Sequence, residues 1–243
     1  MEPFENDLFI LRLLDKNNPD ELRETQKLRY DFLVRGFDPS LPEGGIDDDG
    51  FDEYTDSLIV VEKITGKIVG TYRLATAKSM KGRPFKAEEE FDLTSLKADP
   101  DGIVELGRAV VHPECKDPRV IGMLWKGLFD YAKSEHVRYF IGTCSLHGTD
   151  PSVYDKCWGY LREHVLNKKF NIRAAKNAFE YPVIDGLSMN EAEIPSLLKS
   201  YLLIGGTVSL NGYIDSVFNS TDVLVIADTW NLDERRMRFF LRF

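Results

Sequence analysis

The sequence predicts an α/β protein in which helices flank one mixed β-sheet, with a C-terminal extension. Short β-branched runs alternate with amphipathic stretches in the order strand, helix, three strands, helix, strand, helix. Of the 243 residues, 43% are hydrophobic and 29% are charged, which is typical of a globular chain. No internal repeat or Ser/Pro linker divides it, so we expect one domain over residues 1–243, with a core at about 8–180 and the extension at about 181–243.

In the first half of the chain, local signals mark the elements. Asn18-Pro19-Asp20 combines a capping side chain with an acidic residue in the first turn, so we expect a helix to begin there and to end near Gly36. Its inner side would consist of Leu22, Leu28, Phe32 and Leu33. Thr65-Gly66 between two β-branched runs predicts a hairpin. The expected strands are Leu8–Leu14, Ser57–Lys63, Lys67–Ala77 and Ile103–Val111.

The second half continues the alternation of strands and helices. Apolar residues recur at helical spacing from Val120 to His136, which predicts a helix. Further helices are expected over Pro151–Leu166, Ile194–Leu203 and Leu232–Phe240. The remaining strands are expected over Tyr139–Leu146, Thr207–Tyr213 and Asp222–Ala227.

Charge and cysteine content exclude several classes of protein. A net charge of −9 argues against a generally basic protein that coats nucleic acid. No apolar run approaches the roughly 18–20 residues that span a bilayer, and the acidic start lacks the features of a signal peptide. Three cysteines are too few for a disulfide framework. We therefore expect a cytoplasmic protein.

Eight short strings occur in order over roughly residues 20 to 240. They are Leu28-Arg29-Tyr30-Asp31-Phe32, Asp49-Gly50-Phe51-Asp52, Val69-Gly70-Thr71-Tyr72-Arg73-Leu74, Glu90-Phe91-Asp92-Leu93, Glu105-Leu106-Gly107-Arg108, Val111-His112-Pro113, Leu124-Trp125 and Phe218-Asn219-Ser220-Thr221-Asp222-Val223. Together they resemble the GNAT acyltransferase superfamily, and within it the bacterial N-acyltransferases that make lyso-ornithine and related lipids. These enzymes are relatives of the acyl-homoserine-lactone synthases.

The resemblance implies a GNAT-like fold and transfer of a long-chain (3-hydroxy)acyl group to the α-amine of an amino acid, either ornithine or glycine. The superfamily's pyrophosphate loop survives only as Arg119-x-x-Gly122-x-Leu124. This departure fits a donor carried on the phosphopantetheine of acyl carrier protein, so we expect no other cofactor and no metal. We assign donor binding to Val110, Val111, Arg119 and Gly122. A second departure is Ser57, where the branch usually has His.

Two residues are candidates for proton transfer. The resemblance implies that Glu105 faces the acceptor amine and acts as general base. The alternative is a structural pair between Glu105 and Arg73. Glu105 and Arg108 lie three apart on a predicted strand, so their side chains would point to opposite faces unless a bulge intervenes. Tyr154 would protonate the leaving thiolate, or it would simply pack.

Five charged residues are candidates for binding the acceptor. A guanidinium suits a carboxylate, and Arg29, Arg73 and Arg108 match the arginines of the family. Asp49 and Asp52 match its acidic pair, which would attract the acceptor's ammonium. Structural ion pairs are the alternative for the arginines, and a solvated surface is the alternative for the acidic run 47–56.

Metal sites and a covalent cysteine are weaker interpretations. The acidic run lacks the first ligand and the bidentate Glu of a calcium loop. His112-x-x-Cys115 and Cys144-x-x-His147 have no turn glycines of a zinc knuckle. In a strand, Cys144 and His147 point to opposite faces, so we expect a buried, inert Cys144.

Basic residues suggest partners. Acidic acyl carrier protein would dock on two clusters, which are Lys78, Lys81, Arg83 and Lys86, and Lys168, Lys169, Arg173 and Lys176. The basic, aromatic end after residue 234 would suit peripheral contact with an anionic membrane. Two rival functions stay open: a homoserine-lactone synthase, which the absence of Trp between Phe32 and Phe51 disfavours, and a non-catalytic acyl-carrier-binding module.

Overall fold

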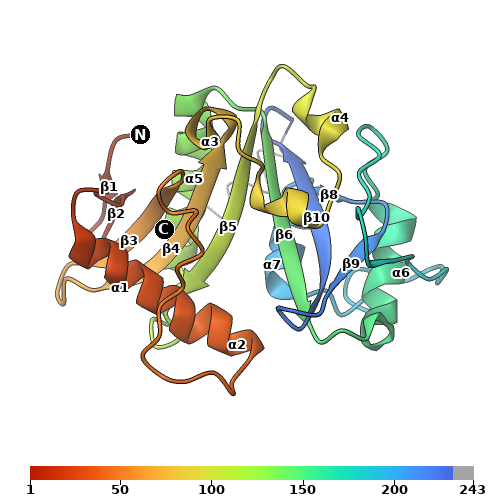
Figure 1. The fold of residues 1–243 in the computed structure, drawn as a ribbon, viewed down its shortest axis with the longest axis horizontal. Helices are drawn as coiled ribbons and strands as arrows, with labels where there is room; N and C mark the ends of the chain where they lie inside the picture. The colour runs from red at the N-terminus through yellow and green to blue at the C-terminus, as the bar shows by residue number, and fades with distance from the viewer. Residues whose placement is uncertain (232–243) are drawn as a thin grey trace. The chain divides into compact units, whose positions relative to one another are not determined.

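The computed structural model describes residues 1–231, and these form two compact units. Among these residues, the first unit contains Met1–Arg83 and Leu106–Val137, and the second contains Pro84–Glu105 and the residues from Arg138 to Asn231. Figure 1 shows the elements of both units in chain order by colour. That the chain folds as a single domain stays a prediction.

The first unit is a sheet with helices on both faces. Its strand order is β1-β2-β3-β4 followed by the later residues of β5, and the pairs from β1 to β4 are antiparallel. The strands are β1 (Phe4–Glu5), β2 (Phe9–Leu13), β3 (Asp56–Glu62), β4 (Ile68–Thr76) and β5 (Ile103–Val111). The helices are α1 (Pro19–Arg29), a π-helical turn (Tyr30–Val34), α2 (Arg35–Phe37), α3 (Ala77–Met80) and α5 (Arg119–Glu135).

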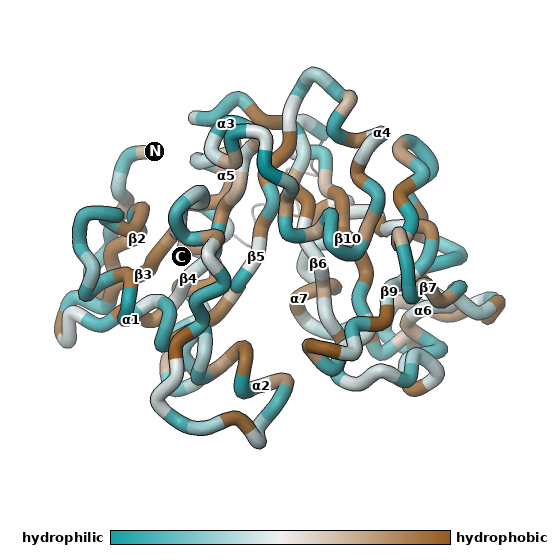
Figure 2. The backbone as a smooth tube through the Cα atoms, in the orientation of Figure 1, coloured by the Kyte–Doolittle hydropathy of each residue, from teal (hydrophilic) through white to brown (hydrophobic). Residues whose placement is uncertain are grey.

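Alternation along β3 explains why both faces are covered. Leu58 lies against Gly127 of α5, where an added Cβ would come within 3.1 Å of the Leu58 side chain. The next residue, Ile59, clusters instead with Leu28 of α1. Successive side chains of a strand point to opposite faces, so a buried strand needs apolar residues at every position. Figure 2 shows this hydrophobic character along β2 and β3.

The second unit has its own strands. The first residues of β5 pair in parallel with β6 (Tyr139–His147), and this pairing is limited to Ile103–Glu105 with Tyr139–Ile141. β6 continues antiparallel to β10 (Ser220–Asp228), followed by β9 (Gly212–Asp215) and β7 (Ala178–Phe179), while β8 (Thr207–Val208) also pairs with β10. The helices are the 3₁₀ turns η2 (Lys86–Glu89) and η3 (Pro151–Tyr154), with α4 (Thr94–Lys97), α6 (Asp155–His164) and α7 (Ser196–Leu203).

The predicted mixed α/β class is confirmed, and two details are wrong. Phe32 was expected on the inner side of the first helix but is 40% exposed. The π-helical turn changes the winding after Arg29, so the helical face rotates at that point. The strand expected over Thr207–Tyr213 is divided because Leu210 donates its N–H to Ile172 rather than to β10.

Two further predictions concern the ends of elements and membranes. The helix expected over Leu232–Phe240, with its proposed membrane contact, lies outside the described residues. Within residues 1–231, no helix has both the length and the apolar character needed to cross a bilayer.

Candidate active site

Arg29 is the centre of an ion network in the first unit. Its side chain is fully buried at the end of α1, where Nη1 and Nη2 donate to the two carboxylate oxygens of Asp52 at 2.8 and 2.6 Å. Nη2 also donates to the backbone carbonyl of Asp47 at 2.7 Å, and Nε lies 2.9 Å from the Asp47 carboxylate. Gln26, one turn earlier on α1, donates to Asp52 at 3.0 Å. Arg29 therefore holds the 47–52 segment against α1.

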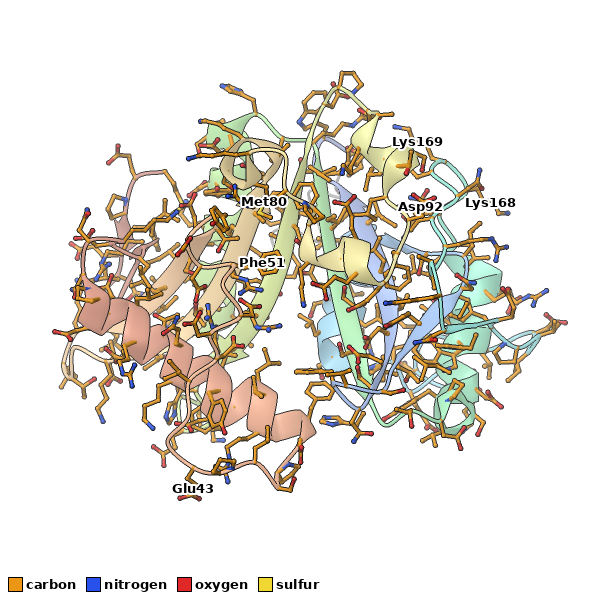
Figure 3. All side chains as sticks on the ribbon, viewed as in Figure 1. Glu43, Phe51, Met80, Asp92, Lys168 and Lys169 are labelled. Carbon is orange, nitrogen blue, oxygen red and sulfur yellow. The ribbon has the colours of Figure 1, made fainter. Side chains whose placement is uncertain are left out.

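Arg73 and Arg108 complete this network. Arg73, on β4, donates through Nη1 and Nη2 to the two oxygens of Asp49 at 2.6 and 2.8 Å. Its guanidinium also lies 5.3 Å from the ring centre of Phe51, a residue labelled in Figure 3. Arg108 donates from Nε to Asp47 at 2.8 Å and from Nη2 to Asp49 at 3.0 Å. Three arginines thus face three aspartates.

The electrostatics of the network favour the ionised carboxylates. Burial would raise the pKa of Asp49, but hydrogen bonds and charge from Arg73 and Arg108 outweigh it, so the pKa lies well below its usual range. The same balance, with Arg29 as the main partner, lowers the pKa of Asp52. Buried carboxylates paired in this way remain charged at neutral pH.

The network decides between the two interpretations of the acidic run. Three of its aspartates pair with buried arginines rather than facing solvent, so the solvated surface is wrong for them. Asp47 and Gln26 take part in the network although the sequence did not single them out. Helical spacing could have identified Gln26, because it lies three residues before Arg29 and therefore on the same face of the helix.

Among the three arginines, Arg108 is the most accessible. Its side chain is 18% exposed, against 6% for Arg73 and 0% for Arg29. It is also the only one whose backbone lies in the left-handed region, at φ 52°, so the regular strand alternation assumed for Glu105 and Arg108 does not continue through this residue. Arg108 is therefore the most accessible of the three to a carboxylate, while the fully buried Arg29 pairs with Asp47 and Asp52; that any of them binds the acceptor stays a prediction.

Glu105 lies in the second unit, at the last position where β5 pairs with β6. It is 8% exposed, and its carboxylate accepts the backbone N–H groups of Lys86 at 2.9 Å and Ala87 at 2.7 Å. These are the first two residues of η2, so Glu105 satisfies donors that the start of a helix leaves free.

Tyr154 ends η3, and its hydroxyl donates to the backbone carbonyl of His147 at 3.0 Å. Its ring packs edge-on against Trp158, with centroids 6.2 Å apart. The packing that the sequence offered as the alternative is therefore present. Its assignment as the acid that protonates the thiolate stays a prediction.

The predicted donor residues lie on β5 and at the start of α5 in the first unit. Val110 is buried and Val111 is half-buried, while Gly122 lies in the first turn of α5. Asp117 lies just before α5, where it accepts the backbone N–H of Arg119 at 2.9 Å and pairs with its guanidinium at 2.6 Å. A carboxylate there repels a phosphate anion.

Three other predicted features also have a place in the structure. Burial raises the pKa of Cys144 to about 12, so this thiol is inert as expected. Ser57 is buried on β3 directly across from Arg73, which puts a small hydroxyl where the family's His would stand. A cavity of about 380 Å³ opens between α1 and the β3–β4 hairpin, but no residue assigned above to catalysis, acceptor or donor lines it.

The basic clusters are only partly free to attract a partner. Arg83 lies 3.7 Å from the ring centre of Tyr54, and Lys78 pairs with Glu135. In the second cluster Lys169, labelled in Figure 3 beside Lys168, pairs with Asp99 at 3.0 Å. Docking of an acidic carrier on these clusters stays a prediction.

Comparisons with known proteins agree with the resemblance. Residues 28–126 match the acetyltransferase (GNAT) domain family. L-ornithine N(alpha)-acyltransferase from Rhodobacter capsulatus is 30% identical over 238 residues, covering 91% of this chain and 91% of that protein. The enzyme of the same name from Agrobacterium fabrum is 28% identical over 241 residues, covering 92% of this chain and 82% of that protein.

Solved structures establish the fold. A CoA-dependent acyl-homoserine lactone synthase, MesI, matches with a TM-score of 0.54 and 18% identity over 96% of this chain and 95% of that one. A second such synthase, BjaI, solved with SAM and isopentyl-CoA, matches with a TM-score of 0.53 and 14% identity over 95% of this chain and 86% of that one. At such identities the likeness concerns the fold alone, which confirms the expected GNAT-like architecture.

Proposed function

This chain belongs to the GNAT acyltransferases whose members include the L-ornithine N(alpha)-acyltransferases, and from that premise we propose that it transfers a long-chain acyl group to the α-amine of ornithine. The similarity to the Rhodobacter capsulatus enzyme over 91% of both chains carries this proposal. It also favours ornithine over glycine as the acceptor.

The reaction would proceed by attack of the amine on a thioester. The nitrogen of ornithine forms a bond to the carbonyl carbon, its proton passes to Glu105, and the carbon–sulfur bond breaks. The departing thiolate takes a proton from Tyr154, which leaves an amide and a free thiol, and the proton on Glu105 then returns to the Tyr154 oxygen through solvent. Arg108 would bind the carboxylate of ornithine, because a guanidinium offers paired donors to a carboxylate.

Acyl carrier protein is the donor that we propose. Asp117 supports this choice, since its carboxylate takes the first backbone N–H at the start of α5 and would repel the pyrophosphate of coenzyme A. Phosphopantetheine bound to a carrier protein lacks the adenosine diphosphate and does not need that position. Asp117→Asn should therefore improve the use of acyl-CoA more than the use of the acyl-carrier donor.

The test is a purified assay with ornithine and either 3-hydroxyacyl carrier protein or 3-hydroxyacyl-CoA, with the product identified by mass spectrometry. We expect a lyso-ornithine lipid from the carrier-bound donor, with a rate at least ten-fold above that from acyl-CoA. Equal or faster transfer from acyl-CoA would refute the donor assignment alone. Folded protein that acylates ornithine from neither donor would refute the proposed function.

A further inference from the structure

Three carboxylates meet in the second unit. Glu90 follows η2, Asp215 ends β9 and Asp222 lies on β10, and one oxygen from each lies within 4.8 Å of the others. We call these residues the acidic triad. Glu90 and Asp222 belong to two of the strings that carry the family resemblance, although they are far apart in the sequence.

In the part of the chain that the structure describes, no ion pair compensates the triad, although the charge of Lys86 acts on Glu90 and lowers its pKa. Asp222 is only 2% exposed, and its Oδ1 is buried without a hydrogen-bond partner. The Oε2 atom of Glu90 is likewise buried and unpartnered. Within residues 1–231, no Lys, Arg or His forms an ion pair with any of the three carboxylates, and the nearby Lys86 pairs through Nζ with Glu89 at 2.7 Å. Buried carboxylate oxygens without a hydrogen-bond partner are costly, which points to a ligand that compensates them.

The pKa values of Glu90 and Asp222 are raised, as expected for buried carboxylates that no bound cation neutralises. Burial, followed by the charges of Asp222 and Asp215, raises the pKa of Glu90 to about 8. Burial also raises the pKa of Asp222 to about 7, with the Ser145 and Ser220 hydroxyls opposing and Asp215 adding. A bound cation would reverse both shifts, since opposite charge favours the ionised carboxylate.

A primary ammonium matches this arrangement in number and spacing. It has three N–H donors, one for each carboxylate. With N–O distances of about 2.8 Å and tetrahedral geometry, the three acceptor oxygens would lie ~4.6 Å apart, within the separation observed.

The triad is linked to the proposed base through one turn of backbone. Ala87 donates its N–H to Glu105, and Glu90 donates its own N–H to the carbonyl of Ala87, so Glu90 follows by one 3₁₀ turn the residue that Glu105 contacts. Such a turn rises about 6 Å. The two nitrogens of ornithine, separated by five bonds, lie about 6 Å apart when the side chain is extended.

We infer that Glu90, Asp215 and Asp222 bind the side-chain ammonium of the acceptor and so select a diamino acid over an acceptor with one amine. This inference rests on the proposed function, since Glu105 must receive the α-amine for the other end to reach the triad. A divalent cation is the competing occupant, because carboxylate oxygens also suit Mg²⁺ and Ca²⁺.

The test compares ornithine with norvaline, which has the same carbon chain without the second amine. Asp222→Asn and Glu90→Gln keep the shape of each side chain, and Asp185→Asn, an exposed acid of the same unit, is the matched control. We expect the wild-type kcat/KM for ornithine to exceed that for norvaline by about 10³-fold, and each triad variant to lose at least ten-fold of that preference. Norvaline turnover should persist, and the melting temperature at pH 8 should not fall.

Several outcomes would overturn the inference. They are equal losses for ornithine and norvaline in the triad variants, or a wild-type enzyme that accepts both amino acids equally. The second result would leave the acyltransferase function intact. A third is calorimetric binding of Mg²⁺ or Ca²⁺ that Asp222→Asn abolishes while ornithine binding is unchanged.

A failure of the proposed function can be recognised separately. If neither amino acid is acylated, calorimetry of ornithine alone decides the inference, because binding does not require the acyl donor. Ornithine binding that Asp222→Asn weakens by ten-fold or more, with Asp185→Asn unaffected, would support the triad. Binding that is the same in both variants would refute it.

Discussion

The molecule has two clusters of buried acidic residues, and they differ in whether arginines neutralise their charge. In the first unit, three aspartates each contact an arginine, and the pKa values of Asp49 and Asp52 are lowered. In the second unit, the acidic triad has no such partner, and the pKa values of Glu90 and Asp222 are raised. A cluster that is complete within the chain stabilises the fold, whereas one that lacks its counter-charge is suited to bind a ligand.

Removing an arginine from the network of the first unit should lower the free energy of unfolding more than any other change proposed below. Arg29→Ala removes the main partner of the buried Asp52 and leaves it only the hydrogen bond from Gln26 and the more distant Arg73, and such a loss typically costs about 3–5 kcal/mol of the free energy of unfolding. Denaturant unfolding followed by circular dichroism measures this. Arg35→Ala, which removes a half-exposed arginine from a weak 3.6 Å pair, is the control and should change stability by less than about 1 kcal/mol. Equal small effects would contradict a structural role for Arg29.

Glu105 tests the catalytic part of the second unit. Glu105→Gln should lower kcat by about 10²–10⁴-fold, because the amide cannot accept the proton of the amine. Only one of the two backbone N–H bonds can be kept, so the melting temperature must be measured beside the rate. Glu89→Gln, on the adjacent turn, should retain full activity. Near-wild-type turnover of Glu105→Gln would exclude it as the base.

Arg108 tests whether the arginine network also binds the acceptor, because it is the most accessible of the three arginines. Arg108→Gly removes the guanidinium and suits the left-handed backbone, so we expect the KM for ornithine to rise about ten-fold without loss of stability from strain. Arg108→Ala should show the same KM and a lower melting temperature. An unchanged KM in both variants would show that Arg108 does not bind the acceptor.

The pH dependence of stability reports on the uncompensated cluster. Glu90 has a folded-state pKa of about 8, above the 4.5 of an exposed glutamate, so the folded protein binds more protons between these values. The contribution of Glu90 to stability is therefore fully present below about pH 4.5 and is lost as pH rises through about 8, by about 1.4 kcal/mol for each unit of pKa shift. Thermal unfolding without acceptor should show this fall, and Glu90→Gln should reduce it. If the difference in melting temperature between the wild type and Glu90→Gln did not change with pH, the raised pKa of Glu90 would be contradicted.

Much of the fold follows from local sequence. The strand Ile103–Val111 was predicted with its observed bounds, because β-branched residues and flanking glycine mark it. The first helix begins where Asn18 was expected to cap it, with the Asn18 side chain accepting the N–H of Glu21 at 3.3 Å. The division of Thr207–Tyr213 was missed, because it depends on Ile172, a partner that is distant in sequence.

Some features of the candidate site could likewise be predicted from the sequence, and others required the tertiary structure. The sequence by itself determined the acyltransferase family and the charged residues Arg29, Asp49, Asp52, Arg73, Glu105 and Arg108, since residue types in order are enough to carry a resemblance. Only the tertiary structure decided that Asp47 completes the arginine network and that Glu90, Asp215 and Asp222 meet. Whether a buried charge is paired with an opposite charge depends on contacts between segments that are distant in the sequence. Local sequence patterns do not predict such contacts.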